Sequence, residues 1–468
     1  MKKNIQISEQ VRFILLIIGV GALLRLFNLD SASFWTDEIY TWRLAPELKL
    51  LSEGVPDDQH PPLYYLLFHY LMRVDDSETW LRLPSAIAGI LTIPLIWLTG
   101  RTINQPRWGL ITAALFALAP LFVWYGREAR MYGPVTLFWG ASLLFYARLL
   151  YGDNWLDVVG FGVATLLGLL TAYPTLALWG LELSFFWVLW HGNGRSLTRL
   201  GRWLLAQIII VVGLSQWWPY MQIQLGRGGV FNWPILPAIG IDLTNDLRGI
   251  LMVAGAGGAT IFGAGILLWL LIWWQPRLLT VGQRLLPVVS GLLIIGFVAV
   301  TIGGAIPYGL SIRRQLLVFV FPFLFMVGGA IVYWERPLLT KSLLILTGVA
   351  ALVPVFGPSF EDWRGARDYI VAAAEAGDEI IMTPAWIVQS FDYYEQPELP
   401  PYRGSDLAAY AQGAPGHQAG ERIWLVYLDH PTNRPASQAA IDWFAANGTV
   451  LNRVDFPRNI VVIEYEIR

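Results

Sequence analysis

The sequence predicts a mainly α-helical, polytopic membrane protein that ends in a small α/β domain. Hydrophobic residues make up 55% of the 468 residues and charged residues 14%, against ~25% in an ordinary soluble protein. Charge is also uneven along the chain. Residues 357–468 hold 8 Arg, no Lys and 16 Asp plus Glu, while the first 356 residues hold 24 basic and 18 acidic residues. We therefore expect a weakly basic membrane domain (1–356) followed by an acidic soluble domain (357–468).

Apolar runs that can cross ~30 Å of hydrocarbon as helices recur through the first domain. In order they are 12–29, 82–100, 108–125, 134–150, 156–173, 174–190, 203–219, 250–274, 285–306, 315–334 and 341–356. They predict a transmembrane helical bundle of about eleven spans. The count can change by one or two. The run 156–190 can be divided differently, and 60–72 can be either a span or a surface helix.

Basic residues in short loops indicate the cytoplasmic side of a membrane protein. The clusters are Lys2, Lys3, Arg12, Arg101, Arg107, Arg195, Arg199, Arg202, Arg277, Arg284, Arg336 and Lys341. Threading the spans alternately places all of them on one face. We expect a multi-pass protein of the plasma or inner membrane with a cytoplasmic N-terminus. The first outer loop (30–81), the loops 126–133, 220–249 and 307–314, and the tail domain would then be extracytoplasmic.

The tail reads as alternating helices and strands. A helix is expected from a capping-box-like start at Ser359 and Asp362 to Gly377. Further helices are expected at 385–395 and from about Pro435. The predicted strands are 379–383, 422–428, 450–455 and 459–467, and a Pro/Gly-rich loop covers 397–420.

The composition excludes several classes of function. Without Cys, the chain can have no disulfide, thiolate metal site or Cys nucleophile. A net charge of −2 gives no indication of a nucleic-acid partner. The phosphate-binding pattern G-x-x-x-x-G-K-[ST] and the zinc pattern H-E-x-x-H are both missing from the sequence.

The first outer loop carries the most informative carboxylates. Asp37 and Glu38 follow Trp35, and the pair Asp57-Asp58 ends two residues before His60. One interpretation is a polar loop at the headgroup level, anchored by aromatic residues. The other is a carboxylate general base at the membrane surface, with or without a divalent cation.

Arginines form two further clusters on the same expected face. Arg127 and Arg130 lie in the turn that ends at Tyr132, and Arg313 and Arg314 precede a span. Such residues can simply extend toward the interface. Two separate clusters are better explained by phosphate binding, for which the guanidinium is suited. Arg25, near the outer end of the first span, could pair with an acidic group of the loop that follows.

These residues together resemble a known family. Asp37-Glu38, His60-Pro-Pro-Leu-Tyr64-Tyr65, the run from Arg127 to Tyr132 and Arg313-Arg314 are similar to motifs of the GT-C membrane glycosyltransferases. The resemblance is to bacterial relatives of the protein O-mannosyltransferases and of the lipid A aminoarabinose transferase. It covers roughly residues 10–356, and the start of the tail at Asp362-Trp363-Arg364 also resembles the outer domain of many bacterial members.

The resemblance implies a polyprenyl-phosphate-linked sugar as donor and a lipid, glycan or protein hydroxyl as acceptor, with inversion at the anomeric carbon. Asp37 would be the general base or the group that orients the acceptor, supported by Glu38 and Arg25. The donor phosphate would be held by Arg130, Arg313, Arg314, Arg127 and Tyr132. His60 and Tyr64 would shape the site. No cofactor is certain; a divalent cation at Glu38 and His60 stays open, since members differ in metal requirement and Gln59 stands where some carry an acid.

Two other classes of function remain as alternatives. A transporter or flippase of a lipid-linked substrate would use a similar helical frame, with charges near the middle of the membrane. A non-catalytic scaffold would bind a partner through its tail. The grouping of the candidate residues on one expected face, together with the lack of an inverted repeat, favours the transferase.

Overall fold

The structure is a computed structural model. It describes residues 2–47, 60–152, 154–192, 196–226, 287–288, 290–298, 301, 310–356, 361–404, 417–429 and 434–468. The chain forms two compact units. We call the first the helical unit, made of Met1–Phe27, Leu48–Asp76 and Trp80–Gly357. The second, the sheet unit, is made of Asn28–Glu47, Ser77–Thr79 and Pro358–Arg468.

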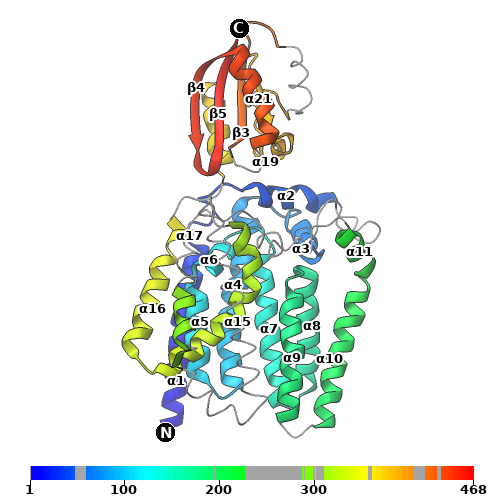
Figure 1. The fold of residues 1–468 in the computed structure, drawn as a ribbon, viewed down its shortest axis with the longest axis vertical. Helices are drawn as coiled ribbons and strands as arrows, with labels where there is room; N and C mark the ends of the chain where they lie inside the picture. Colours follow the sequence, from blue (N-terminus) through cyan, green and yellow to red (C-terminus); the bar gives the residue numbers. More distant parts are fainter. Residues whose placement is uncertain are drawn as a thin grey trace. The chain divides into compact units, whose positions relative to one another are not determined.

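The helical unit is built from long helices that run side by side (Figure 1). Its helices are α1 (Lys2–Leu26), α3 (Leu63–Leu71), α4 (Glu78–Thr102), α5 (Pro106–Leu118), α6 (Pro120–Tyr125), α7 (Tyr132–Tyr151), α8 (Trp155–Thr171), α9 (Thr175–Gly192), α10 (Leu197–Ser215), α11 (Trp218–Gly226), α15 (Leu310–Trp334), α16 (Pro337–Ala350) and α17 (Val353–Phe356). Helix α8 packs against both α7 and α10, and α5 packs against α1 and α15. This arrangement confirms the predicted mainly helical architecture.

Four helices in the described part of the chain are long and apolar enough to cross a membrane. They are Glu78–Thr102, Tyr132–Tyr151, Leu197–Ser215 and Pro337–Phe356. The predicted span 250–274 lies outside the described residues, and 285–306 is described only in part. The number of spans therefore stays a prediction.

One predicted span is divided, and the run 60–72, for which the sequence allows either a span or a surface helix, contains a short helix. The run 108–125 is divided into α5 and α6 at Ala119, whose ψ of 121° is extended. The residue before a proline avoids the helical region, and Pro120 then occupies the first helical position of α6. The run 60–72 contains only the nine-residue helix α3. At 1.5 Å per residue this helix is too short to cross the ~30 Å of hydrocarbon.

Small residues bring α7 close to α4 and so place the turn that precedes α7. A Cβ at Gly133 would lie 2.7 Å from the Cα of Ser85, so only glycine fits there. The Ser85 hydroxyl donates a hydrogen bond of 3.0 Å to the backbone carbonyl of Arg130. The turn 126–131 is thereby fixed against α4.

The sheet unit contains a five-stranded sheet in the order β2-β1-β3-β5-β4. The strands are β1 (Glu379–Thr383), β2 (Tyr402–Gly404), β3 (Arg422–Leu428), β4 (Gly448–Phe456) and β5 (Ile460–Ile467). Strand β1 is parallel to β2 and β3, while β5 is antiparallel to β3 and β4. The four predicted strands are confirmed, and β2 is an additional short strand within the expected loop 397–420.

Helices cover both faces of this sheet. On one face lies α21 (Arg434–Asn447) (Figure 1). Its Phe444 packs among Leu425, Ile463 and Tyr465. On the other face, α18 (Trp363–Ala373) places Tyr369 edge-on against Trp424, with ring centroids 5.9 Å apart. Trp424 and Leu425 are neighbours in β3, so their side chains point to opposite faces.

Three details of the tail differ from the sequence prediction. Asp362 is itself the N-cap of α18, and its carboxylate accepts a hydrogen bond of 2.9 Å from Gly365. The helix ends at Ala373, before Gly377. The helix expected at 385–395 is a 3₁₀ turn (Ala385–Ile387) followed by α19 (Val388–Tyr393).

Candidate active site

Asp37 and Glu38 lie in the first turn of α2 (Thr36–Leu44), within the sheet unit. Trp35 is the N-cap residue, with an extended backbone. The Glu38 carboxylate accepts a hydrogen bond of 3.3 Å from the N–H of Trp35, and Glu38 is fully buried. Acidic side chains in a first turn are stabilised by the partial positive charge of the helix N-terminus. Glu38 therefore holds the start of the helix.

The residues before Asp37 are anchored by Glu361. Its Oε2 atom accepts hydrogen bonds from the Thr36 N–H (2.8 Å), the Thr36 hydroxyl and the Trp363 indole (2.9 Å). The Ser33 hydroxyl donates to the Glu361 backbone carbonyl at 2.6 Å. Asp37 and its neighbours are thus fixed to residues at the start of the tail.

A second set of contacts holds Phe34. Its N–H lies 3.1 Å from Oε1 of Glu78 and 2.6 Å from the Tyr394 hydroxyl. Glu78 also accepts hydrogen bonds from Tyr394 and Arg364. Three segments distant in the sequence therefore converge on the backbone just before α2.

Arg25 is completely buried in the helical unit. Its Nη1 donates to the carbonyls of Gly21 (3.1 Å) and Ala117 (3.0 Å), and its Nη2 to that of Phe116 (3.4 Å). A Cβ at Gly89 would lie 2.7 Å from its Nε, so that glycine makes room for the guanidinium. Backbone carbonyls compensate much of the burial of this cation. Its pairing with a carboxylate stays a prediction.

Arg127 closes the C-terminal end of α1. Its Nη1 lies 3.2 Å from the carbonyl of Leu24, 3.4 Å from that of Arg25 and 2.7 Å from that of Phe27. Carbonyls at a helix C-terminus lack partners within the helix and favour a cation. These contacts favour a structural role for Arg127 over the predicted phosphate contact.

Arg130 and Tyr132 lie at the end of the same turn, and both are buried. The Tyr132 ring packs on Tyr125, with centroids 4.7 Å apart. Two further charged residues join this region, Glu128 in the turn and Arg82 in α4, both almost fully buried. Burial, and secondly the charge of Arg82, lower the pKa of Arg127 to about 10. The turn is therefore part of a buried, arginine-rich cluster.

Sequence reasoning missed Arg82. It stands at the first position of the apolar run 82–100, which the sequence predicts to be a membrane span. An arginine in such a run is itself a signal, because charged residues in apolar helices face the interior and are often functional.

His60 and Tyr64 lie at the start of α3. The His60 carbonyl accepts a hydrogen bond of 3.1 Å from Gln224 of α11, and Gln224 in turn accepts one from the Tyr173 hydroxyl. The Trp217 indole donates to the same hydroxyl at 2.9 Å. This buried polar chain, which the sequence did not indicate, fixes the backbone at His60. Tyr64 is buried and packs against Phe68.

Several of the predicted site residues are not among those that the structure describes. Asp57 and Asp58 lie outside the described residues, and so do the side chains of Arg313 and Arg314 in the first turn of α15. Their assignments stay predictions.

The metal interpretation rests on Glu38 and His60. Among the described residues, three or more His, Cys, Asp or Glu side chains do not gather as a set of metal ligands. The Glu38 carboxylate already accepts the Trp35 N–H. Within the described part of the chain, Glu38 and His60 do not belong to a donor set that fits a cation.

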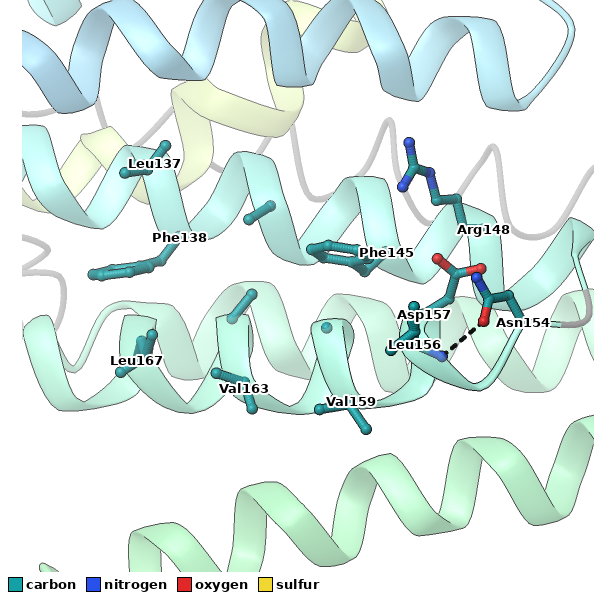
Figure 2. A pocket seen from close by; sticks show the side chains of 13 residues that line it. Leu137, Phe138, Phe145, Arg148, Asn154, Leu156, Asp157, Val159, Val163 and Leu167 are labelled. Carbon is teal, nitrogen blue, oxygen red and sulfur yellow. Dashed lines mark hydrogen bonds between the residues drawn. The ribbon is translucent and has the colours of Figure 1, made fainter.

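A cavity of about 630 Å³ lies between α7 and α8 (Figure 2). Its walls are mostly apolar, including Phe138, Phe145 and Val163. Arg148, Asn154 and Asp157 gather at one end. All its lining residues come from α7, α8 and the connection between them, so it is separate from the arginine-rich turn.

Residues 59–220 match the family of dolichyl-phosphate-mannose-protein mannosyltransferases. The resemblance to the membrane glycosyltransferases is confirmed. The glycosyltransferase match includes His60, Arg127 and Arg130, whereas Asp37 and Arg313 lie outside it. No curated protein matches the chain in sequence.

Solved structures of glycosyltransferases are similar to this chain. Two of them match nearly its whole length, and a third matches about half of it. ArnT from Cupriavidus metallidurans in the apo state is 13% identical, with 97% of this chain and 98% of that chain covered and a TM-score of 0.49. ArnT from the same organism bound to undecaprenyl phosphate is 14% identical, with 96% and 97% covered and a TM-score of 0.47. A protein O-mannosyltransferase complex of S. cerevisiae bound to the sugar donor is 16% identical, with 46% and 34% covered and a TM-score of 0.39.

Proposed function

We propose that the chain is an integral membrane glycosyltransferase that moves a sugar from a polyprenyl-phosphate donor to an acceptor hydroxyl on a lipid, glycan or protein. The observation that supports this most is the match to the mannosyltransferase family over residues 59–220, which contains the buried arginine cluster of the turn 126–131. The description of that family names a lipid phosphate as the carrier of the sugar. An arginine-rich site suits such a phosphate.

Asp37 is the general base in this proposal. Its carboxylate takes the proton of the acceptor hydroxyl, and the oxygen attacks the anomeric carbon. The bond from that carbon to the phosphate oxygen breaks, and the polyprenyl phosphate leaves with the electron pair. A single displacement inverts the anomeric centre, because the acceptor oxygen attacks the face opposite the leaving group, as in inverting glycoside hydrolysis.

Arg130, Arg313 and Arg314 bind the donor phosphate and stabilise the charge that develops on it. A phosphate monoester leaving group is a weak base, so stabilising its charge matters more than protonating it. Glu38 and Arg127 serve as structural supports, in keeping with their hydrogen bonds. Arg25 supports the helices around it.

The reaction takes place on the extracytoplasmic face. The basic short loops mark the cytoplasmic side, and the proposed site residues belong to the opposite side. A reporter active only in the cytoplasm, fused after Arg468, should be silent, and the same reporter fused before Met1 should be active. The reverse pattern would contradict this orientation.

A transfer assay tests the function itself. The purified full-length chain in lipid is given a synthetic polyprenyl-phosphate sugar and an acceptor extract. We expect a labelled product with the anomeric configuration opposite to that of the donor. Donor that stays intact over a series of sugars and acceptors would contradict the proposal, and donor moved across vesicles without reaction would favour a flippase.

A further inference from the structure

We propose that Glu361 is a positioning residue for Asp37: its carboxylate caps helix α2, which carries Asp37, through the neighbouring residue Thr36. The inference rests on the proposed function, in which Asp37 is the base. Both residues belong to the sheet unit, although Asp37 lies in its N-terminal segment and Glu361 in its C-terminal one.

The first step of the argument concerns the N-terminus of α2. The first N–H groups of a helix have no partner within it and are usually satisfied by a side chain at the N-cap. Here the N-cap residue is Trp35, whose side chain makes no such bond. The N–H of Thr36, the first residue of the helix, donates to Glu361 instead, at 2.8 Å. A distant carboxylate thus takes over the capping.

The geometry around this carboxylate is well defined. The same Oε2 atom also accepts the hydroxyl of Thr36 and the indole N–H of Trp363. The Ser33 hydroxyl holds the Glu361 backbone carbonyl at 2.6 Å. Glu361 binds both the backbone N–H and the side-chain hydroxyl of Thr36, the residue directly before Asp37. These contacts therefore restrict the position of the first turn of α2. A reactive group is effective only when it is held close to its productive geometry.

The second step concerns charge. Burial raises the pKa of Glu361, and the charge of Asp37 raises it further, while the hydrogen bonds from Thr36 and Trp363 act in the opposite direction. Other charged groups near this turn are Glu38, whose carboxylate accepts the Trp35 N–H, and Glu78 and Arg364, which pair with each other. The carboxyl group of Glu361 therefore lies within reach of the charge of Asp37.

The simpler alternative is that Glu361 is a cap and nothing more. Glu361→Gln separates the two roles, because glutamine keeps an oxygen that can accept the Thr36 N–H but cannot ionise. Glu361→Ala removes both. Glu379→Gln is the matched control, since Glu379 lies in β1 of the same unit and pairs with the partly exposed Arg403 at 2.6 Å.

The experiment uses the full-length chain in lipid, with a synthetic polyprenyl-phosphate sugar as donor. We expect Glu361→Ala to lower kcat about tenfold or more, with donor KM unchanged, because the base is misplaced while the phosphate site is intact. Glu361→Gln should recover most of the rate at the pH optimum. Its pH–rate profile should lack the inflection that ionisation of Glu361 adds to the wild type, and Glu379→Gln should behave as wild type.

A second measurement does not depend on activity. Hydrogen exchange of the amides of residues 33–38 should be faster in Glu361→Ala and near wild type in Glu361→Gln. Normal kcat and normal exchange in Glu361→Ala would overturn the proposal, as would a Glu361→Gln profile that keeps the inflection or an equal loss in Glu379→Gln. A wild-type chain that transfers no sugar would contradict the proposed function, while the exchange data would still decide whether Glu361 holds the helix.

Discussion

Glu361 accepts a hydrogen bond from the backbone N–H of Thr36, the residue directly before Asp37. This contact lies within one folded unit, which contains the N-terminal segment 28–47 and the C-terminal segment 358–468. The tail is therefore more than an appendage to the membrane domain. It is part of the structure that fixes the proposed base.

Stability should depend on pH through Glu361. Its pKa in the folded chain is raised above the ordinary value of 4.5, so the folded state binds this proton more strongly than the unfolded state. The proton on Glu361 makes its full contribution to the stability of the folded state below about pH 4.5. That contribution is lost as the pH rises through the raised pKa of Glu361. We expect the thermal midpoint of the wild type to fall relative to that of Glu361→Gln over this range. A difference that is constant with pH would show that Glu361 does not titrate there.

Gly89 should be sensitive to substitution. In Gly89→Ala the new Cβ would lie 2.7 Å from Nε of Arg25, whose guanidinium is fixed by three carbonyls. Overpacking of this kind costs about 1–3 kcal/mol, so the thermal midpoint should fall. Gly19→Ala is the matched control in α1, because nothing lies within 4 Å of its Cβ. Equal midpoints for both variants would mean that Arg25 can move aside.

Arg127 should matter for folding more than for the donor. Arg127→Gln removes the charge that holds the last carbonyls of α1, and hydrogen bonds from a charged group are worth about 1.5–3 kcal/mol. Unfolding in detergent should begin at a lower temperature, while donor affinity of the folded fraction stays near wild type. Arg12→Ala, an exposed arginine of α1, serves as control. A large loss of donor affinity without loss of stability would instead show that Arg127 binds the donor phosphate.

Arg313 and Arg314 are predicted to bind the donor phosphate. Changing both to Ala should weaken binding of a polyprenyl-phosphate sugar about tenfold to a hundredfold, since a charge-assisted hydrogen bond contributes roughly 1.5–3 kcal/mol. Equilibrium binding of a labelled donor measures this directly. Unchanged affinity in the double variant would leave these residues as anchors of α15 at the membrane edge.

Regular elements were predictable where the sequence pattern is local. Strand β3 has the predicted bounds 422–428, because its apolar run is short and bounded by turn residues. Helix α7 covers the predicted run 134–150 for the same kind of reason. The break at Pro120 also has a local cause in the sequence, because the residue before a proline avoids the helical region.

The candidate site was predictable only in part. Asp37 and Glu38 could be singled out, because adjacent carboxylates beside a membrane span are unusual. Their support by Glu361, Glu78 and Tyr394 could not be predicted, because those contacts join segments far apart in the chain. The contacts also depend on the folded tail. The role of Arg127 could not be predicted either. It caps the C-terminal end of α1 from a turn that is distant in the sequence, and such a contact leaves no local sequence pattern.

The central claim is that Asp37 acts as the base. Asp37→Asn keeps the shape of the side chain and removes its basicity. The direct measurement is the rate of sugar transfer from a synthetic polyprenyl-phosphate donor at equal amounts of folded protein, with Asp30→Asn, an exposed residue of the same segment, as control. We expect a loss of about 10²-fold or more in kcat with donor binding retained, and a normal rate for the control. A near-normal rate for Asp37→Asn would contradict the account.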